Sequence, residues 1–195
     1  MDNKLRIVNY LGKHAGQSFT MLELSKATGV PYATFYRTLQ KMEKLVKMQR
    51  VGKSKIVTLN MDNASIKPYL AISSEEEKQD FLKKQPILGK IAYELKTKDV
   101  VVLFGSYAKR SETERSDIDL LIISKGGEKS LSFSKYEVLF RKKINPIFVT
   151  KSEFEKMLRD RDENVGKQAL KSHIILNNPE SFWEGVLHGR IQEAV

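Results

Sequence analysis

Two fully apolar runs, separated by a short polar segment, constrain the fold of this 195-residue chain more than any other feature. The runs are residues 100–104 and 120–123, and the first is rich in valine. Short β-branched runs of this kind are typical of strands buried on both faces. The polar segment opens with Gly105-Ser106 and closes with Asp117-Ile118-Asp119, so polar chemistry lies at the ends of two predicted strands.

The residues at these strand ends suit the binding of phosphate groups. Gly105 allows a tight backbone turn, and Ser106 is expected at a helix N-terminus, whose N–H groups attract anions. Asp117 and Asp119 alternate along a strand, so both carboxylates point to one face. Such a pair suits Mg²⁺, which takes water and phosphate oxygens as further ligands. The combination predicts phosphoryl or nucleotidyl transfer; the alternative is a surface turn with an acidic strand end.

This stretch resembles the nucleotidyltransferases of the DNA polymerase beta superfamily, and in particular their minimal single-domain members. Their pattern is a strand, Gly-Ser, about ten residues, and Asp-x-Asp entering the next strand, as in Gly105-Ser106 and Asp117-Ile118-Asp119. The resemblance implies catalytic and metal-binding roles for Asp117 and Asp119, and nucleotide binding by Gly105 and Ser106. It also implies Mg²⁺ and a nucleoside triphosphate, ATP first among them, as cofactors.

Two positions depart from the family pattern. Arg110 stands where the family has a glycine, so it either crowds the phosphate site or contacts phosphate and joins the nucleotide-binding set. The family's third carboxylate belongs on a later strand, predicted at residues 144–150, which holds Asn145 and no acid; Glu137 and Glu153 fall outside it. An amide cannot serve as a base. Nucleotide and Mg²⁺ binding are therefore expected to survive better than catalysis.

Most of the excess positive charge lies in the first third of the chain. The net charge is +10. Residues 1–60 hold 11 Lys and Arg against 3 Asp and Glu, a net of +8, whereas residues 61–195 hold 23 against 21, a net of +2. This distribution predicts a basic module with a polyanionic partner, joined to a nearly balanced one.

The basic module has the element order of a winged helix-turn-helix. Thr20 and Glu23 have capping-box spacing, Gly29 suits a helix C-terminus, and Pro31 suits the first turn of a third, longer helix whose apolar period continues to Val46. A hairpin over residues 48–59 with a basic tip follows. Residues 22–59 resemble that family, which implies binding of double-stranded DNA through Tyr32, Ala33, Thr34, Tyr36, Arg37, Lys41, Arg50, Lys53 and Lys55. The alternative is a protein-contact module with solvated lysines.

The predicted fold class is therefore α/β of the α+β kind: a winged helix-turn-helix plus a small mixed-sheet nucleotidyltransferase-like domain. The expected boundaries are 1–60 for the DNA-binding domain, 61–98 for a helical connector and 99–195 for the nucleotidyltransferase-like domain with C-terminal helices. Ser74 and Glu77 have a second capping-box spacing, which predicts a helix start. Trp183 is expected to be a packing anchor.

Two functions remain open. The chain is either a DNA-binding transcriptional regulator with an impaired nucleotidyltransferase-like domain, or an active nucleotidyltransferase. The latter would transfer a nucleoside monophosphate to a protein, RNA or small molecule, as in toxin–antitoxin pairs. A homodimer and a toxin-like protein partner are expected. The absence of cysteine and of a long apolar run predicts a cytoplasmic chain with no disulfide and no membrane span.

Overall fold

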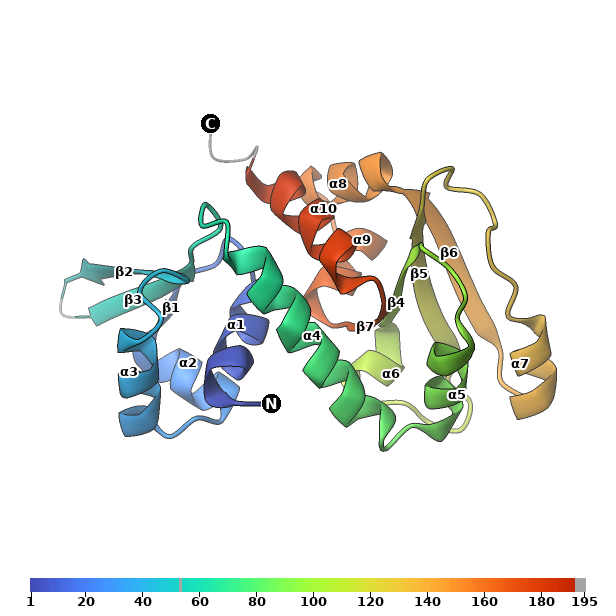
Figure 1. Ribbon diagram of the computed structural model, residues 1–195, viewed down its shortest axis with the longest axis horizontal. Helices are drawn as coiled ribbons and strands as arrows, with labels where there is room; N and C mark the ends of the chain where they lie inside the picture. The colour runs from blue at the N-terminus through green and yellow to red at the C-terminus, as the bar shows by residue number, and fades with distance from the viewer. Residues whose placement is uncertain (53, 192–195) are drawn as a thin grey trace. The chain divides into compact units, whose positions relative to one another are not determined.

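The computed structural model describes residues 1–52 and 54–191 (Figure 1). The chain divides into two compact units, Met1–Ser73 and Ser74–Val195. Each unit combines helices with one β-sheet, which confirms the predicted mixed α/β class. Within the described residues, no helix has the length and apolar character needed to cross a membrane.

The first unit packs three helices against a small antiparallel sheet. Its elements are α1 (Asn3–Lys13), β1 (Phe19–Thr20), α2 (Met21–Thr28), α3 (Tyr32–Gln40), β2 (Val46–Val51) and β3 (Ser54–Leu59), with strand order β1-β3-β2. The helices and the sheet bury a common apolar core, formed by Ile7, Val8, Leu11, Leu24, Phe35, Leu39, Met42 and Val57. Three helices followed by a hairpin were expected in this order, whereas strand β1 was not predicted; the winged helix-turn-helix assignment stays a prediction.

Local signals set two of the helix boundaries here. Thr20 and Glu23 form the capping box, in which each side chain accepts the other residue's backbone N–H. The bonds from the Thr20 backbone N–H and hydroxyl lower the pKa of Glu23. Gly29 ends α2 in the left-handed conformation, with φ +65°. Both features were predicted because they depend on neighbours in sequence.

The third helix is shorter than its apolar period predicts. It ends at Gln40, and residues 41–45 form turns that lead into β2. Met42, Leu45 and Val46 are nevertheless buried. Consecutive turns can present side chains to a core at the same spacing as a helix, so the period persists where the helix does not.

The predicted helix start at Ser74 is wrong. A continuous helix, α4 (Ile66–Leu82), passes through Ser74 and Glu77, and Pro68 lies in its first turn, where a missing N–H costs nothing. Ser73 and Ser74 are both buried. The capping-box spacing also occurs inside helices, so tertiary packing decides whether it marks an end.

The second unit is a four-stranded mixed sheet covered by helices. Its elements are α5 (Pro86–Glu94), β4 (Val100–Phe104), α6 (Gly105–Lys109), β5 (Ile118–Ser124), α7 (Ser134–Phe140), β6 (Ile144–Thr150), α8 (Lys151–Arg159), α9 (Val165–Lys171), β7 (Ile174–Asn177) and α10 (Pro179–Ile191). The strand order is β6-β5-β4-β7. Strand β4 is antiparallel to β5 and β7, and β5 is parallel to β6.

Helices cover both faces of this sheet (Figure 1). On one face, residues of β4 and β5 such as Leu103 and Leu120 share a core with Leu88 and Ile91 of α5 and with Tyr136 of α7. Helices α8, α9 and α10 pack on the strands from the other face. Alternate side chains of β5 therefore enter different cores, which explains its uninterrupted apolar run.

Edge strand β6 has most of its outward backbone donors occupied. Since the Ile118 N–H donates to the Lys143 carbonyl, even-numbered residues of β6 direct their backbone away from β5. Glu137 accepts the Ile144 N–H at 2.9 Å, and Glu153 accepts the Thr150 N–H at 2.7 Å. Pro146 has no N–H to offer. Strand addition at this edge is thereby disfavoured.

A carboxylate ties α5 to α7 beside that edge. Hydrogen bonds from Lys135, Lys90 and Tyr136 lower the pKa of Glu94 to about 2. A lowered pKa means that the stabilising contribution is complete above the ordinary pKa of glutamate and is lost as the pH falls through about 2. The tie therefore persists at mildly acidic pH.

The indole of Trp183 is fully buried and donates to the Ser74 hydroxyl at 2.8 Å, as expected of a packing anchor. We expect Trp183→Phe to lower the free energy of unfolding by about 2 kcal/mol, because volume and a buried hydrogen bond are both lost. Ser74→Ala leaves the buried indole N–H without this acceptor and should cost about 1–3 kcal/mol. Urea unfolding followed by circular dichroism measures both, and a Trp183→Phe midpoint equal to wild type would contradict the anchor role.

Candidate nucleotide and metal site

The two predicted catalytic aspartates lie where β5 begins. Asp117 immediately precedes β5, and Asp119 is its second residue. Backbone pairing places Asp119 between Phe104 of β4 and Asn145 of β6. The sheet therefore brings the end of the first apolar run, the aspartate pair and the amide of β6 into one row.

Asn145 bridges the two carboxylates. Its Nδ2 donates to Asp117 Oδ2 at 3.1 Å and to Asp119 Oδ1 at 3.3 Å. One small donor atom thus reaches both carboxylates, so the pair converges on a volume that a single cation could share. Lys143 also approaches, with Nζ 3.4 Å from Asp117 Oδ2.

The donor set fits Mg²⁺, which binds one or two carboxylates and completes its shell with water and phosphate oxygens. Asp117 and Asp119 would hold the ion, and the amide oxygen of Asn145 could turn toward it. Among residues 1–52 and 54–191, no group of three or more His, Cys, Asp or Glu side chains could hold a metal. A metal held between Asp117 and Asp119 would therefore have two carboxylate ligands. Glu137 is the last acidic residue before Asn145 in the sequence, and its carboxylate accepts a hydrogen bond from the Ile144 N–H.

Gly105 permits a very close approach to Asp119. Its φ is +71°, and a Cβ built there would lie 2.3 Å from Asp119 Oδ2. That separation is far below van der Waals contact, so no side chain fits without displacing the carboxylate. Ser106 follows in the first turn of the short helix α6.

Arg110 lies at the other end of α6. It is the C-terminal cap in the left-handed conformation, with φ +57°, which accounts for the suitability of glycine at this place. Its guanidinium carbon lies 6.0 Å from the centre of the Phe81 ring. The structure thus brings Gly105, Ser106, Asp117 and Asp119 together, whereas Arg110 contacts α4; its nucleotide-binding role stays a prediction.

The predicted DNA-binding residues form an exposed surface on the first unit. Tyr32, Ala33, Tyr36 and Arg37 are exposed on α3, and Thr34 is partly buried. Lys41, Arg50 and Lys55 are exposed on the turn after α3 and on the hairpin; Lys53 lies outside the described residues.

Helix α3 and strand β3 meet within this surface. Lys55 Nζ lies 5.9 Å from the centre of the Tyr36 ring, within the range of a cation–π contact. A hollow of about 360 Å³ opens beside the pair and is lined by Leu22, Tyr32 and Ser54 among others. The surface thus combines aromatic, apolar and cationic groups, which suits either DNA or a protein.

Comparison of the sequence with known protein families finds a match in the second unit. The nucleotidyltransferase domain family model matches residues 87–176, from the start of α5 to β7. The chain contains a nucleotidyltransferase domain. The match spans all the residues of the aspartate site. No curated protein matches the chain, and no solved structure matches it.

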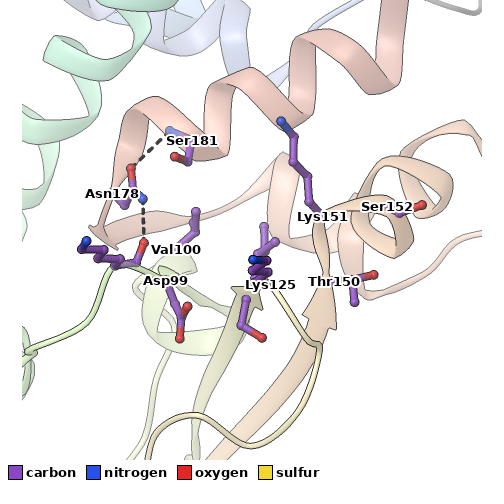
Figure 2. A pocket seen from close by; sticks show the side chains of 11 residues that line it. Asp99, Val100, Lys125, Thr150, Lys151, Ser152, Asn178 and Ser181 are labelled. Atoms are coloured by element: carbon purple, nitrogen blue, oxygen red, sulfur yellow. Dashed lines mark hydrogen bonds between the residues drawn. The ribbon is translucent and has the colours of Figure 1, made fainter.

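Sequence reasoning missed two features of this domain. The first is Lys143, which lies two residues before Asn145. Side chains two residues apart along a strand point to the same face, so the sequence could have placed Lys143 beside the aspartates. The second missed feature is a hollow of about 610 Å³ at the opposite end of the sheet, near Val100, Lys125 and Thr150 (Figure 2). Its residues are scattered along the sequence.

We expect Gly105→Ala to destabilise the domain by about 2 kcal/mol or more and to displace Asp119, because the new methyl group meets a carboxylate in a strained backbone conformation. Gly126→Ala is the matched control, since nothing lies within 4 Å of its added Cβ. Thermal unfolding together with Mg²⁺ titration measures both effects. Equal behaviour of the two variants would contradict the close approach.

Proposed function

We propose that the chain is a DNA-binding transcriptional regulator whose nucleotidyltransferase domain binds a Mg²⁺–nucleoside triphosphate, ATP first among them, with weakened catalysis. For the nucleotidyltransferase domain, the observation that carries this proposal is the bridge from Asn145 to Asp117 and Asp119. It supports a site that can still hold a cation between two carboxylates but lacks a third acid beside them.

The chemistry of nucleotidyl transfer explains why the amide matters. The oxygen of an acceptor hydroxyl forms a bond to the α-phosphorus of the triphosphate. The bond between the α-phosphorus and the oxygen that bridges to the β-phosphate breaks, so pyrophosphate leaves, and the hydroxyl proton passes to a base. When bound, Mg²⁺ neutralises phosphate charge. Asp117 and Asp119 supply the negative charge that would bind the cation, and Gly105 has no side chain that would displace the Asp119 carboxylate. Asn145 cannot accept a proton, so it orients the pair without acting as a base.

Asn145→Asp should strengthen Mg²⁺ binding by about tenfold, since a third carboxylate raises the negative charge of the ligand set. Calorimetric titration with Mg²⁺, with and without ATP, measures the change. Asn63→Asp is the matched control: it makes the same charge change in the first unit, where the side-chain oxygen of Asn63 accepts the Ser65 N–H and a carboxylate can do the same. A weaker or unchanged affinity in Asn145→Asp would count against a metal between the aspartates.

Charge and exposure support DNA as the partner of the first unit. Residues 1–60 carry a net charge of +8, and the exposed face of α3 adjoins the basic start of β3. A recognition helix reads bases, whereas lysines on a hairpin contact phosphates.

Lys55→Ala should weaken binding to duplex DNA uniformly and reduce the slope of log affinity against log salt by about 1, as expected for one lost phosphate contact. Arg37→Ala should instead weaken the preferred sequence more than random DNA. Fluorescence anisotropy with a selected and a scrambled duplex separates the two effects. Lys129→Ala, which removes a charge from the second unit, is the control. Loss of DNA binding in all three variants, the control included, would contradict the assignment of α3 and the hairpin as the DNA-binding surface.

An active nucleotidyltransferase is the second candidate. It is favoured by the intact Gly105-Ser106 and Asp117-Asp119 pairs and by the family match over residues 87–176. The acceptor would be a protein, RNA or small molecule, in an antitoxin-like role. Incubation with labelled ATP, GTP, CTP and UTP and candidate partners tests it, with Asp117→Asn/Asp119→Asn as control. Labelling that survives in the control would exclude this site as its source.

A homodimer completes the proposal, because winged helices commonly bind paired half-sites about 34–36 Å apart. Sedimentation equilibrium near the concentration that saturates DNA measures the mass. A monomer on a single half-site would contradict it.

A further inference from the structure

A hollow of about 610 Å³ lies at the end of the sheet opposite to the aspartates (Figure 2). Its floor is formed where β4 begins and where β5 and β6 end, since Val100 pairs with Ile123 and Ser124 pairs with Thr150. From Asp119 to Ser124 the strand advances roughly 16 Å at ~3.3 Å per residue. The hollow is therefore separate from the candidate metal site.

Lysines from three separate segments surround the hollow. Lys98 precedes β4, Lys125 follows β5 and Lys151 begins α8. Lys151 forms an ion pair with Glu184 on α10, with Nζ 2.5 Å from Oε1. Among the described residues, neither Lys98 nor Lys125 has a carboxylate within ion-pair distance. Two positive charges at the rim are thus left without a direct ion pair to any described residue.

The lining offers little negative charge to repel an anion. Asp99 is the one carboxylate among its residues, and Asp99 Oδ2 already accepts a hydrogen bond from the Ser130 hydroxyl at 2.7 Å. Ser124, Thr150, Ser152 and Ser181 add hydroxyl groups to the lining, and of these the Thr150 hydroxyl already donates to Glu153 Oε2 at 2.9 Å. The lining is therefore cationic and rich in donors.

Buried residues complete the floor. Val100 and Ile123 are 4% and 8% exposed and form an apolar patch. Ser124 is 7% exposed, and its oxygen accepts the Gly127 N–H at 3.0 Å, which leaves the hydroxyl hydrogen to be donated. An acceptor within the hollow would satisfy that donor. An apolar floor under cationic walls suits a ligand with both an apolar and an anionic part.

The walls are held in place before any ligand binds. Asn178 donates to the Lys98 carbonyl at 2.8 Å and accepts the Ser181 N–H at 3.3 Å, so the start of α10 is fixed to the loop before β4 (Figure 2). On the opposite wall, the Thr150–Glu153 capping box fixes the start of α8. The hydrogen bonds from Thr150 lower the pKa of Glu153, so the carboxylate of this box stays ionised to a lower pH than an ordinary glutamate does. A preformed hollow loses less entropy on binding.

We propose that this hollow binds a nucleoside monophosphate or a molecule of the same kind, with the phosphate at Lys98 and Lys125 and the ring over Val100 and Ile123. The volume is far larger than a phosphate ion requires and lies within the range of small-molecule sites. The ligand would touch the ends of β5 and β6, whose beginnings carry the aspartates and Asn145.

The test uses Asp117→Asn/Asp119→Asn protein in EDTA, so that the metal site contributes nothing. AMP, GMP, CMP and UMP are titrated to about 5 mM and followed by ¹H–¹⁵N chemical-shift changes, with adenosine and inorganic phosphate as partial probes. We expect saturable shifts for at least one nucleotide at Lys125, Ser152 and Ser181. Adenosine and phosphate alone should each bind at least tenfold more weakly.

Lys98→Ala/Lys125→Ala should weaken binding of that nucleotide at least tenfold. Lys84→Ala/Lys109→Ala removes the same charge near α6, at the far end of β4, and should leave the affinity unchanged. Equal thermal midpoints confirm that each variant folds. The proposal is overturned if no nucleotide gives saturable shifts, if the shifts centre on Gly105 and Asn145, or if both lysine pairs weaken binding alike. None of these results depends on whether the chain binds DNA or Mg²⁺.

Discussion

Backbone pairing of β5 on both of its sides is the constraint on which the candidate site depends. Through it, Asp119 lies between Phe104 and Asn145, and the Gly105 backbone closes over the Asp119 carboxylate. A slip of one residue in either pairing would turn the aspartates to the opposite face and bury them among apolar side chains. The apolar residues 120–123 fix the register, so the core of the sheet and the geometry of the site are set together.

Much of this arrangement is predictable because its signals are local. The uninterrupted apolar run of β4, the glycine after it and the Thr20–Glu23 capping box each act within a few residues. The place of Asn145 beside the aspartates needed the resemblance to nucleotidyltransferases in addition, because nothing in the sequence states which strands are neighbours. The strand register and the hydrogen bonds from Asn145 agree with that placement. The roles assigned to the residues stay predictions.

The features that sequence reasoning missed depend on contacts between distant residues. Ser74 looks like a helix start, yet it lies within α4 and accepts a hydrogen bond from Trp183, 109 residues later. Likewise, the apolar period after Leu39 continues although α3 has ended, because burial and not helix geometry produces it. Lys98, Lys125 and Lys151 each resemble ordinary surface charges until the sheet ends bring them around one hollow.

The protected edge of β6 limits how this chain can associate with others. Val138 and Leu139 of the neighbouring α7 are 81% and 59% exposed, which would normally invite association during synthesis and at high concentration. With Pro146, Glu137 and Glu153 occupying its backbone positions, β6 cannot easily template a growing intermolecular sheet of the amyloid kind. Contacts on this side therefore depend more on side chains such as Val138 and Leu139 than on the backbone donors of β6.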